Sequence, residues 1–325
     1  MPIKQIQVVC PANYVTGGAE SLHNLVVAIS SLGVSATIVY FPFSESSLTP
    51  ARFQHYGVKV SVLNDTQDTL VIFPEIFPME ALRLGKAKAA IWWLSLDYFR
   101  ERYDDSLDRY RYIKRALQGR RPIAGIRALR RLLHFSKSYY DESYLRAHGI
   151  TPIRLTGPIS RFYLSKFEEN EQAYRENQIL YNAAKGKATI DLLIARYPQY
   201  SFVPLINLDE HSLLARYQKS KVYADFGHHP GRDRMPRESV VCGCCVITGR
   251  KGSAANPFDI PISDCFKLDE RSERFAEQFA LLVDRVFTNF ELVSAKFEPY
   301  RREVLAEPFQ QLEELRKILA LLTEN

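Results

Sequence analysis

Apolar residues recur along the chain at two spacings, which predict alternating strands and helices. Residues 3–10 form a strand-length apolar run, and residues 19–33 carry apolar side chains at helical spacing up to Gly33. A second apolar run, 34–41, follows directly. This strand–loop–helix–strand order opens an α/β domain, a class that binds ligands beyond the carboxyl ends of its strands.

The same alternation continues in two blocks that are separated by a polar connector. Apolar runs predict strands at 58–63, 69–75, 87–94, 132–136 and 152–160. The first domain is therefore predicted to span residues 1–160. Residues 161–178 are polar and charged, as in an interdomain linker. Residues 175–298 are predicted to form a second domain, and amphipathic helices close the chain.

The stretch 221–248 combines a strand, a basic glycine-containing loop, a short helix and a second strand. The Pro230-Gly231 pair indicates a turn, Pro236 suits the first helical position, and Gly243 suits the helix C-terminal cap. Unpaired backbone N–H groups at the helix start attract anions, above all phosphate. The basic side chains beside them are His228, His229, Arg232, Arg234 and Arg237.

Other candidate residues follow predicted strands, where ligands of such domains bind. Gly17 and Gly18 come after the first strand, where they indicate either close approach of a ligand to the backbone or a tight turn into the helix. Lys185-Gly186 precedes a helix in the second domain. This pair indicates either a contact with phosphate or a solvated turn. Glu75 and Asp97 follow two strands of the first domain, where acidic groups act as bases or hold sugar hydroxyls.

Length and composition are those of a soluble globular protein with material for two domains. The chain has 325 residues, no apolar run of about 18 residues and no signal-peptide pattern at its start, so we expect a cytoplasmic protein. Its five cysteines form no disulfide framework. The C-x-x-C pair Cys242/Cys245 is compatible with zinc or redox chemistry, but we expect these thiols to be buried and predict no metal site and no cofactor.

The net charge of +6 is concentrated in one segment. Arg109–Arg131 holds nine basic residues and no acidic one, interleaved with apolar and tyrosine side chains. Three interpretations remain open: docking on an anionic membrane surface, a solvated helical face, or nucleic-acid binding. No nucleic-acid motif supports the last, so we predict no nucleic-acid partner and a peripheral position on the inner face of the cell membrane.

Three short pieces resemble the retaining, family 4-like glycosyltransferases of the GT-B fold that build bacterial surface polysaccharides. They are TGGAE at 16–20, YNAAKG at 181–186, and DFGHHPGRDRMPRE at 225–238 with the helix–glycine–strand pattern after it. The resemblance implies two Rossmann-like domains facing across a cleft, with a C-terminal helix, about 303–325, crossing back to the first domain. The implied enzyme is a hexosyltransferase-type glycosyltransferase.

The resemblance also implies roles for individual residues. Gly17 and Gly18 approach the donor, Lys185 pairs with its diphosphate, and Glu238 is similar to the second acid of the family's E-x7-E motif, which holds ribose hydroxyls. Pro230 stands where the first acid is expected, and no arginine precedes the lysine, at Asn182. The histidines and arginines of the central loop are candidates to replace the missing acid.

The implied reaction moves a sugar from a nucleotide-sugar donor to a saccharide or lipid-linked acceptor. We expect retention of configuration and no metal requirement, since the leaving diphosphate would be stabilised by Lys185, the loop arginines and the helix start. Asp97 or Glu75 would orient or deprotonate the acceptor hydroxyl. A nucleotide-sugar 2-epimerase and a non-catalytic nucleotide- or sugar-binding subunit are the alternatives, whereas a dehydrogenase is disfavoured because Gly17-Gly18 does not extend into G-x-G-x-x-G.

Overall fold

The computed structural model describes residues 3–43, 48–103, 110, 113–114, 117–118, 125–167 and 174–323. The chain divides into two compact units, which are described separately: unit 1 comprises Met1–Pro158 and Glu307–Asn325, and unit 2 comprises Ile159–Ala306. About half of the basic segment predicted at Arg109–Arg131, including Arg109 itself, lies outside the described residues.

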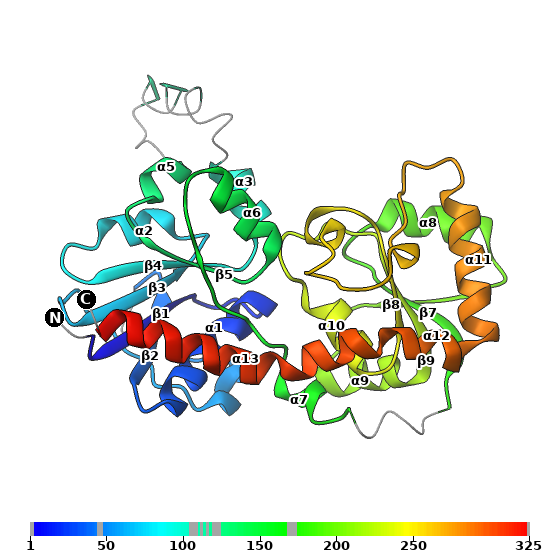
Figure 1. Ribbon diagram of the computed structural model, residues 1–325, viewed down its shortest axis with the longest axis horizontal. Helices are drawn as coiled ribbons and strands as arrows, with labels where there is room; N and C mark the ends of the chain where they lie inside the picture. Colours follow the sequence, from blue (N-terminus) through cyan, green and yellow to red (C-terminus); the bar gives the residue numbers. More distant parts are fainter. Residues whose placement is uncertain are drawn as a thin grey trace. The chain divides into compact units, whose positions relative to one another are not determined.

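Unit 1 contains a parallel six-stranded sheet in the order β2-β1-β3-β4-β5-β6 (Figure 1). Its strands are β1 (Gln5–Pro11), β2 (Ser35–Phe41), β3 (Thr69–Pro74), β4 (Lys88–Trp93), β5 (Leu133–Ser136) and β6 (Ile153–Arg154). In β1, the neighbours Val8 and Val9 point to opposite faces, and both are fully buried. Burial on both faces explains why the strands read as continuous apolar runs.

Helices cover both faces of this sheet. They are α1 (Gly17–Ser31), η1 (Ala51–Tyr56), α2 (Pro78–Arg83), α3 (Leu96–Tyr103), α5 (Ile126–Leu129) and α6 (Tyr139–Ala147). One core joins Leu25 of α1 and Ile318 of α13 (Glu298–Thr323) to the face that carries Val8. The other core joins Phe99 of α3 and Leu145 of α6 to the face that carries Val9. The unit is a doubly wound α/β sheet.

Unit 2 contains a parallel four-stranded sheet in the order β10-β9-β7-β8. The strands are β7 (Glu176–Asn182), β8 (Ser201–Leu205), β9 (Ser220–Asp225) and β10 (Cys245–Thr248). The helices are α7 (Arg161–Leu164), α8 (Lys187–Arg196), α9 (Glu210–Lys219), α10 (Arg234–Val241), α11 (Phe275–Thr288) and α12 (Phe290–Ser294), with short 3-10 turns η4 (Gly252–Ala255), η5 (Asp264–Phe266) and η6 (Ala295–Phe297). A single core around Tyr217, Tyr223 and Phe279 holds them together.

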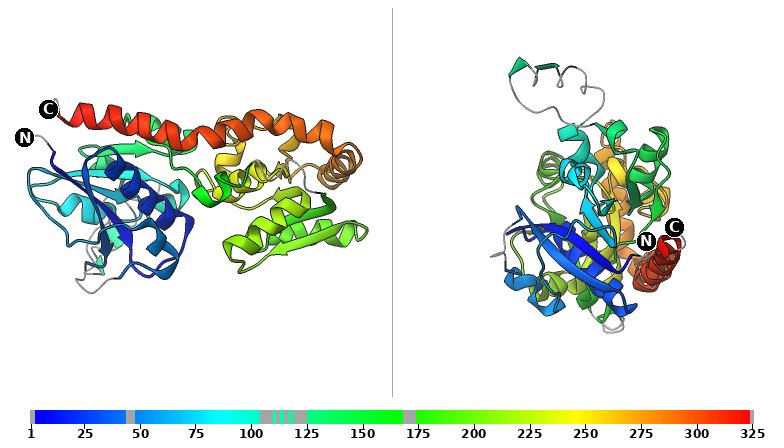
Figure 2. Two further views of the ribbon diagram at one scale, coloured as in Figure 1. Left: turned by 90° about the horizontal axis from the view of Figure 1, so that it is seen from below. Right: turned by 90° about the vertical axis from the view of Figure 1, so that its left-hand side faces the viewer.

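The final helix, α13, is one continuous element of 26 residues that contains Pro308 (Figure 2). Its residues up to Ala306 belong to unit 2, and those from Glu307 onward belong to unit 1. In unit 1, the Glu314 carboxylate accepts the Thr156 N–H and the Gln311 amide donates to the Thr156 carbonyl at 2.8 Å. Within the described ranges, no helix is long and apolar enough to span a membrane.

The strand predicted at residues 58–63 is not formed. Only Val60 pairs with a strand, through a single bridge to Ile38, and the segment is otherwise held by the Gln7 amide, which donates to Ser61 and to the Val62 carbonyl. Val60 and Val62 are 43% and 59% exposed. Its backbone pairs only with Ile38, through the Lys59 carbonyl and the Ser61 N–H, and the Gln7 side chain satisfies the Val62 carbonyl, so the pairing does not extend into a strand.

Candidate functional site

The loops after β7 and β9 lie at the point of unit 2 where the strand order reverses. From β7 the chain moves outward to β8, and from β9 it moves outward in the opposite direction to β10. The carboxyl edge of the sheet at such a reversal is the usual ligand site in open α/β sheets. Lys185 and Gly186 follow β7, and the central loop, residues 226–233, follows β9.

Two glycines allow these loops to touch. Gly186 has φ +64°, and a Cβ atom added there would lie 2.7 Å from the Phe226 carbonyl carbon. A Cβ atom at Gly227 would lie 2.5 Å from the Cβ atom of Lys185. Both separations are too short for any side chain. Backbone packs on backbone here, and the stem of Lys185 lies on the central loop.

Lys185 forms an ion pair across the two loops. The Asn182 side chain accepts the Ala184 N–H at 3.0 Å and shapes the turn that precedes the lysine. Lys185 Nζ lies 2.7 Å from Asp233 Oδ2, and the two side chains are 31% and 18% exposed. The pair is thus partly open to solvent. Asp233 was not among the predicted site residues; it is the residue before the helix, where an acid ordinarily indicates only an N-cap.

His229 is fully buried between two aspartates of unit 2. Its Nε2 atom lies 3.6 Å from Asp225 Oδ1, and its Nδ1 atom lies 3.5 Å from Asp233 Oδ2. Asp225 is itself oriented by the Tyr223 hydroxyl and the Gly227 N–H, which donate at 2.8 and 2.9 Å. His229 therefore lies between the end of β9 and Asp233 in the interior of unit 2, whereas His228 is exposed.

The three predicted arginines, one in the central loop and two in α10, have different environments. Arg232 is buried and donates to Glu303 at 2.6 Å. Arg237 is 1% exposed and donates to the backbone carbonyls of Arg232 and Asp233, so it braces the loop, which includes the buried Gly231. Only Arg234 keeps a substantial part of its side chain exposed, 31%, and it is the arginine best placed to meet an anion.

Glu238 lies inside unit 2. Its side chain is fully buried, and Arg234 Nη1 lies 3.6 Å from its Oε1 atom. Burial, together with the nearby Glu238 charge, raises the pKa of Tyr163 and of Tyr217.

The helix that carries Glu238 begins two residues earlier than predicted. α10 starts at Arg234, which makes Pro236 its third residue. The first-turn N–H groups have no intrahelical acceptor, so proline is tolerated at any of these positions. The prediction for Gly243 is confirmed: its φ is +94°, its N–H donates to the Val240 carbonyl, and the Cys244 N–H donates to the Ser239 carbonyl, which is a Schellman motif.

The cysteines after this helix are buried, as predicted. Cys242, Cys244 and Cys245 are fully buried free thiols, and burial raises the pKa of Cys244 to about 11 and that of Cys245 to about 12. Thiols with raised pKa values are poor nucleophiles and poor metal ligands. Among the residues that the structure describes, no three His, Cys, Asp or Glu side chains are placed to hold a metal ion.

Unit 1 has a comparable edge at its own strand reversal, between β1 and β3. Gly17 and Gly18 are the first residues of α1, capped by the Thr16 hydroxyl, which accepts the Ala19 N–H at 3.3 Å. A Cβ atom at Gly18 would meet only ordinary contacts, the shortest 3.8 Å. The fold of unit 1 by itself thus does not require a glycine at position 18.

Glu75 follows β3 and is 2% exposed. Its Oε2 atom accepts the Leu94 N–H at 2.9 Å, so it holds the loop after β4. Burial raises the pKa of Glu75 to about 7, against the lowering effects of the Leu94 N–H and of Lys137.

Lys137 is a further residue of this edge that was not predicted. It follows β5 directly, is 6% exposed, and donates from Nζ to the Ser21 hydroxyl of α1 at 3.0 Å. Gly157 leaves room for it, since a Cβ atom there would lie 2.6 Å from Lys137 Cε. The sequence could have indicated Lys137 as a candidate site residue, because it directly follows a predicted strand, as Glu75 does.

Asp97 lies in the first turn of α3 and is 5% exposed. Its Oδ1 atom accepts the Tyr140 hydroxyl at 2.8 Å and lies 3.5 Å from Arg100 Nη1. Burial and the Asp97 contact raise the pKa of Tyr140 to about 12. The carboxylate is therefore oriented by its neighbours.

The Glu75 environment predicts a pH-dependent stability of unit 1. The folded pKa of about 7 exceeds the ordinary value of 4.5, so the folded protein binds the proton more tightly. The free energy of unfolding then falls as pH rises between these values. Glu75→Gln should remove up to about 3 kcal/mol of this fall between pH 4.5 and 8.

Urea unfolding followed by tryptophan fluorescence measures the effect, because both tryptophans, Trp92 and Trp93, are buried in β4 of unit 1. Glu80→Gln, which changes a partly exposed carboxylate of α2, is the control. Equal pH dependence in wild type and Glu75→Gln would contradict the prediction.

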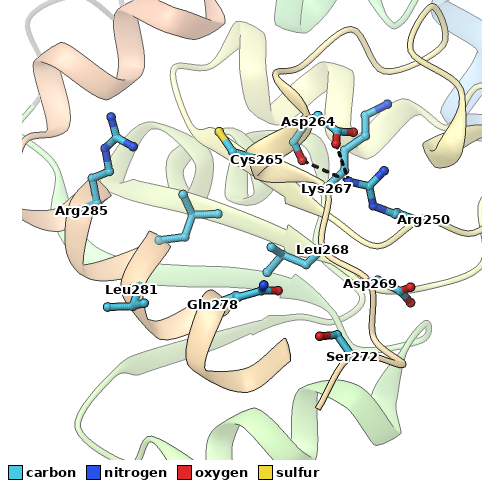
Figure 3. A pocket seen from close by; sticks show the side chains of 11 residues that line it. Arg250, Asp264, Cys265, Lys267, Leu268, Asp269, Ser272, Gln278, Leu281 and Arg285 are labelled. Carbon is cyan, nitrogen blue, oxygen red and sulfur yellow. Dashed lines mark hydrogen bonds and ion pairs between the residues drawn. The ribbon is translucent and has the colours of Figure 1, made fainter. Parts of the chain in front are cut away.

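A separate pocket of unit 2 lies beside η5 and α11 (Figure 3). None of the predicted site residues lines it. Its Arg250 donates to Asp264 at 2.7 Å, and Lys267 donates to the Asn256 carbonyl at 2.9 Å. Two of its three basic residues, Arg250 and Lys267, thus have acceptors within the protein, as Lys185 has. The Lys185 region is the better candidate site because it lies at the strand reversal of unit 2.

Comparison by sequence finds no matching family profile and no matching curated protein. Comparison by structure finds many solved chains, including a glycosyltransferase from Rickettsia africae ESF-5, with 14% identity, a TM-score of 0.64, and coverage of 99% of this chain and 98% of that chain. Sucrose-phosphate synthase from Thermosynechococcus elongatus has 11% identity and a TM-score of 0.65, over 98% and 100% of the two chains.

A third similar structure, trehalose-6-phosphate from E. coli bound with UDP-2-fluoro glucose, has 10% identity and a TM-score of 0.61 over 99% of each chain. At such low identities the likeness shows the fold alone. The fold that these comparisons give is GT-B, as the sequence predicted, with two Rossmann-like α/β units and a C-terminal helix that returns to unit 1.

Proposed function

We propose that this protein is a glycosyltransferase that moves a hexosyl group from a nucleotide-sugar donor to a saccharide or lipid-linked acceptor in polysaccharide biosynthesis. The observation that carries the proposal is the cation Lys185, held at the strand reversal of unit 2 by glycine-mediated packing of two loops. One of the proteins that share its fold was solved bound with UDP-2-fluoro glucose. A lysine on the loop at the carboxyl end of a parallel strand can neutralise the charge of a leaving diphosphate.

The donor side is assigned to unit 2. Lys185 would pair with the diphosphate, Arg234 and the first turn of α10 would add donors, and Glu238 would hold the ribose. Arg232, Arg237 and His229 would act indirectly by holding the loop, because their side chains are buried. Cations and N–H groups together would neutralise the leaving group without a metal ion, and we propose a retaining, metal-independent transfer.

The acceptor side is assigned to unit 1, where Asp97 would orient or deprotonate the acceptor hydroxyl. Glu75 is the less favourable base, since it is 2% exposed and already accepts the Leu94 N–H.

For the basic segment 109–131 we propose contact with anionic lipid. Co-sedimentation with phosphatidylserine vesicles tests that contact, and recovery of all the protein in the supernatant would refute it.

Asp97→Asn should lower turnover by about 100-fold while leaving donor binding within about 2-fold, because the amide keeps the shape of the carboxylate but is not a base. Steady-state kinetics and donor titration separate the two effects. Tyr140→Phe is the control: it removes the hydroxyl group that donates to Asp97 but keeps the carboxylate, so it tests whether Asp97 acts only through this structural contact. Unchanged turnover in Asp97→Asn would remove this residue from the mechanism.

A nucleotide screen tests the proposed function. UDP, ADP, GDP, CMP and dTDP are each added to the full chain, and the melting temperature is recorded, because a ligand that binds the folded state raises it. One nucleoside diphosphate is expected to give a clear upward shift, and its sugar conjugates are then assayed with saccharide and lipid-linked acceptors. Conversion of the sugar without an acceptor would indicate an epimerase, and no shift with any nucleotide would refute the proposal.

A further inference from the structure

The ammonium group of Lys185 already has a carboxylate partner within unit 2. The 2.7 Å ion pair joins residues 48 positions apart, so it results from the fold of the two loops. Asp233 lies at the start of α10, beside the N–H groups of the first helical turn. Its side chain accepts no hydrogen bond from these N–H groups, and its carboxylate meets Lys185 instead.

Asp233 has two neighbours besides Lys185. His229 lies behind it, with Nδ1 at 3.5 Å from Oδ2, and Arg237 Nε donates to its backbone carbonyl at 3.2 Å. The aliphatic part of the Lys185 side chain packs directly on Gly227, where a Cβ atom would lie 2.5 Å from Lys185 Cβ. Both partners are therefore positioned by the fold, and yet both are partly exposed and can be reached by a ligand.

We propose that Asp233 is an internal counterion of Lys185, which competes with the donor's diphosphate for the lysine and so sets how tightly the diphosphate is held and how readily it leaves. This inference rests on the proposed function, because it assigns the diphosphate to Lys185. A diphosphate that approaches Lys185 must displace one carboxylate contact and come close to a negative charge. Both effects weaken binding and speed release of the product nucleotide.

Asp233→Asn should therefore tighten diphosphate binding. The variant removes the competing ion pair and the like-charge repulsion, so we expect about 3- to 10-fold lower dissociation constants for inorganic pyrophosphate and for nucleoside diphosphates. The Michaelis constant for the donor should fall, and the turnover number should stay equal or fall, because product leaves more slowly. A residue that only stabilised the loop would give weaker binding when changed.

The experiment is calorimetric titration of the full chain with inorganic pyrophosphate and with the four nucleoside diphosphates UDP, ADP, GDP and dTDP. Asp191→Asn is the matched control: Lys187 and Asp191 form a 2.6 Å pair of the same type on α8, two residues beyond Lys185, with 74% and 54% of their side chains exposed. Asp191→Asn should change each dissociation constant less than 2-fold. Asp233→Glu retains the charge and should bind like wild type, and melting temperatures confirm that each variant is folded.

The outcomes separate this inference from the proposed function. Tighter pyrophosphate binding by Asp233→Asn, but not by Asp191→Asn, supports the inference even if no nucleotide binds, in which case only the proposed function fails. Weaker or unchanged binding by a folded Asp233→Asn overturns the inference while leaving the proposed function intact. If neither pyrophosphate nor any nucleotide binds wild type or Asp233→Asn, both are overturned.

Discussion

Replacing Lys185 with methionine should lower turnover by about 100- to 1000-fold, because it removes the cation that would neutralise the leaving diphosphate. Methionine keeps an unbranched stem, so the packing on Gly227 is retained. Asp233 then loses its partner but is 18% exposed and can be hydrated, so we expect the free energy of unfolding to change by less than about 1 kcal/mol. Turnover, diphosphate binding and melting temperature are measured together.

The control for this variant is Lys187→Met, which removes an exposed cation two residues away on the same loop-to-helix segment. It should retain turnover within about 2-fold. If Lys185→Met keeps wild-type turnover, Lys185 has no part in the reaction and the donor site lies elsewhere. If both variants lose turnover equally, the general positive charge of this region is responsible.

Replacing Gly186 with alanine should destabilise unit 2 by about 3 kcal/mol or more and abolish nucleotide binding. The residue has φ +64°, which costs alanine about 1 kcal/mol, and its Cβ atom would lie 2.7–2.9 Å from the backbone of Phe226 and Gly227. Backbone atoms cannot rotate away as a side chain can. The loop must shift, and Lys185 moves with it.

Gly57→Ala separates strain from the clash. Gly57 has φ +61°, almost the same conformation, but nothing lies within 4 Å of its Cβ position, so only the cost of about 1 kcal/mol is expected. Calorimetry measures both variants, and tryptophan fluorescence identifies the unit 1 transition, which Gly186→Ala should not change. Equal destabilisation by the two substitutions would show that the two loops do not press on each other.

Some of these residues could be selected from the sequence because the signal is local. Lys185-Gly186 follows an apolar run and precedes a helical pattern, and parallel strands place such positions at one edge. The same rule selected Glu75 in unit 1. It did not discriminate among the basic residues of the central loop, because their burial depends on contacts such as that of Arg232 with Glu303, 71 residues away.

The strand–loop–helix alternation and the α/β fold class were thus determined by the sequence alone, since hydrophobic periodicity and turn residues act over a few neighbours. Tertiary structure alone decided that Gly186 presses on Phe226 and Gly227, that Lys137 lies against α1, and that Asp233 holds Lys185. These contacts depend on strand order, β9 beside β7, which brings together segments that are distant along the chain. No local pattern encodes that order, because it is selected by the burial of both faces of each sheet at once.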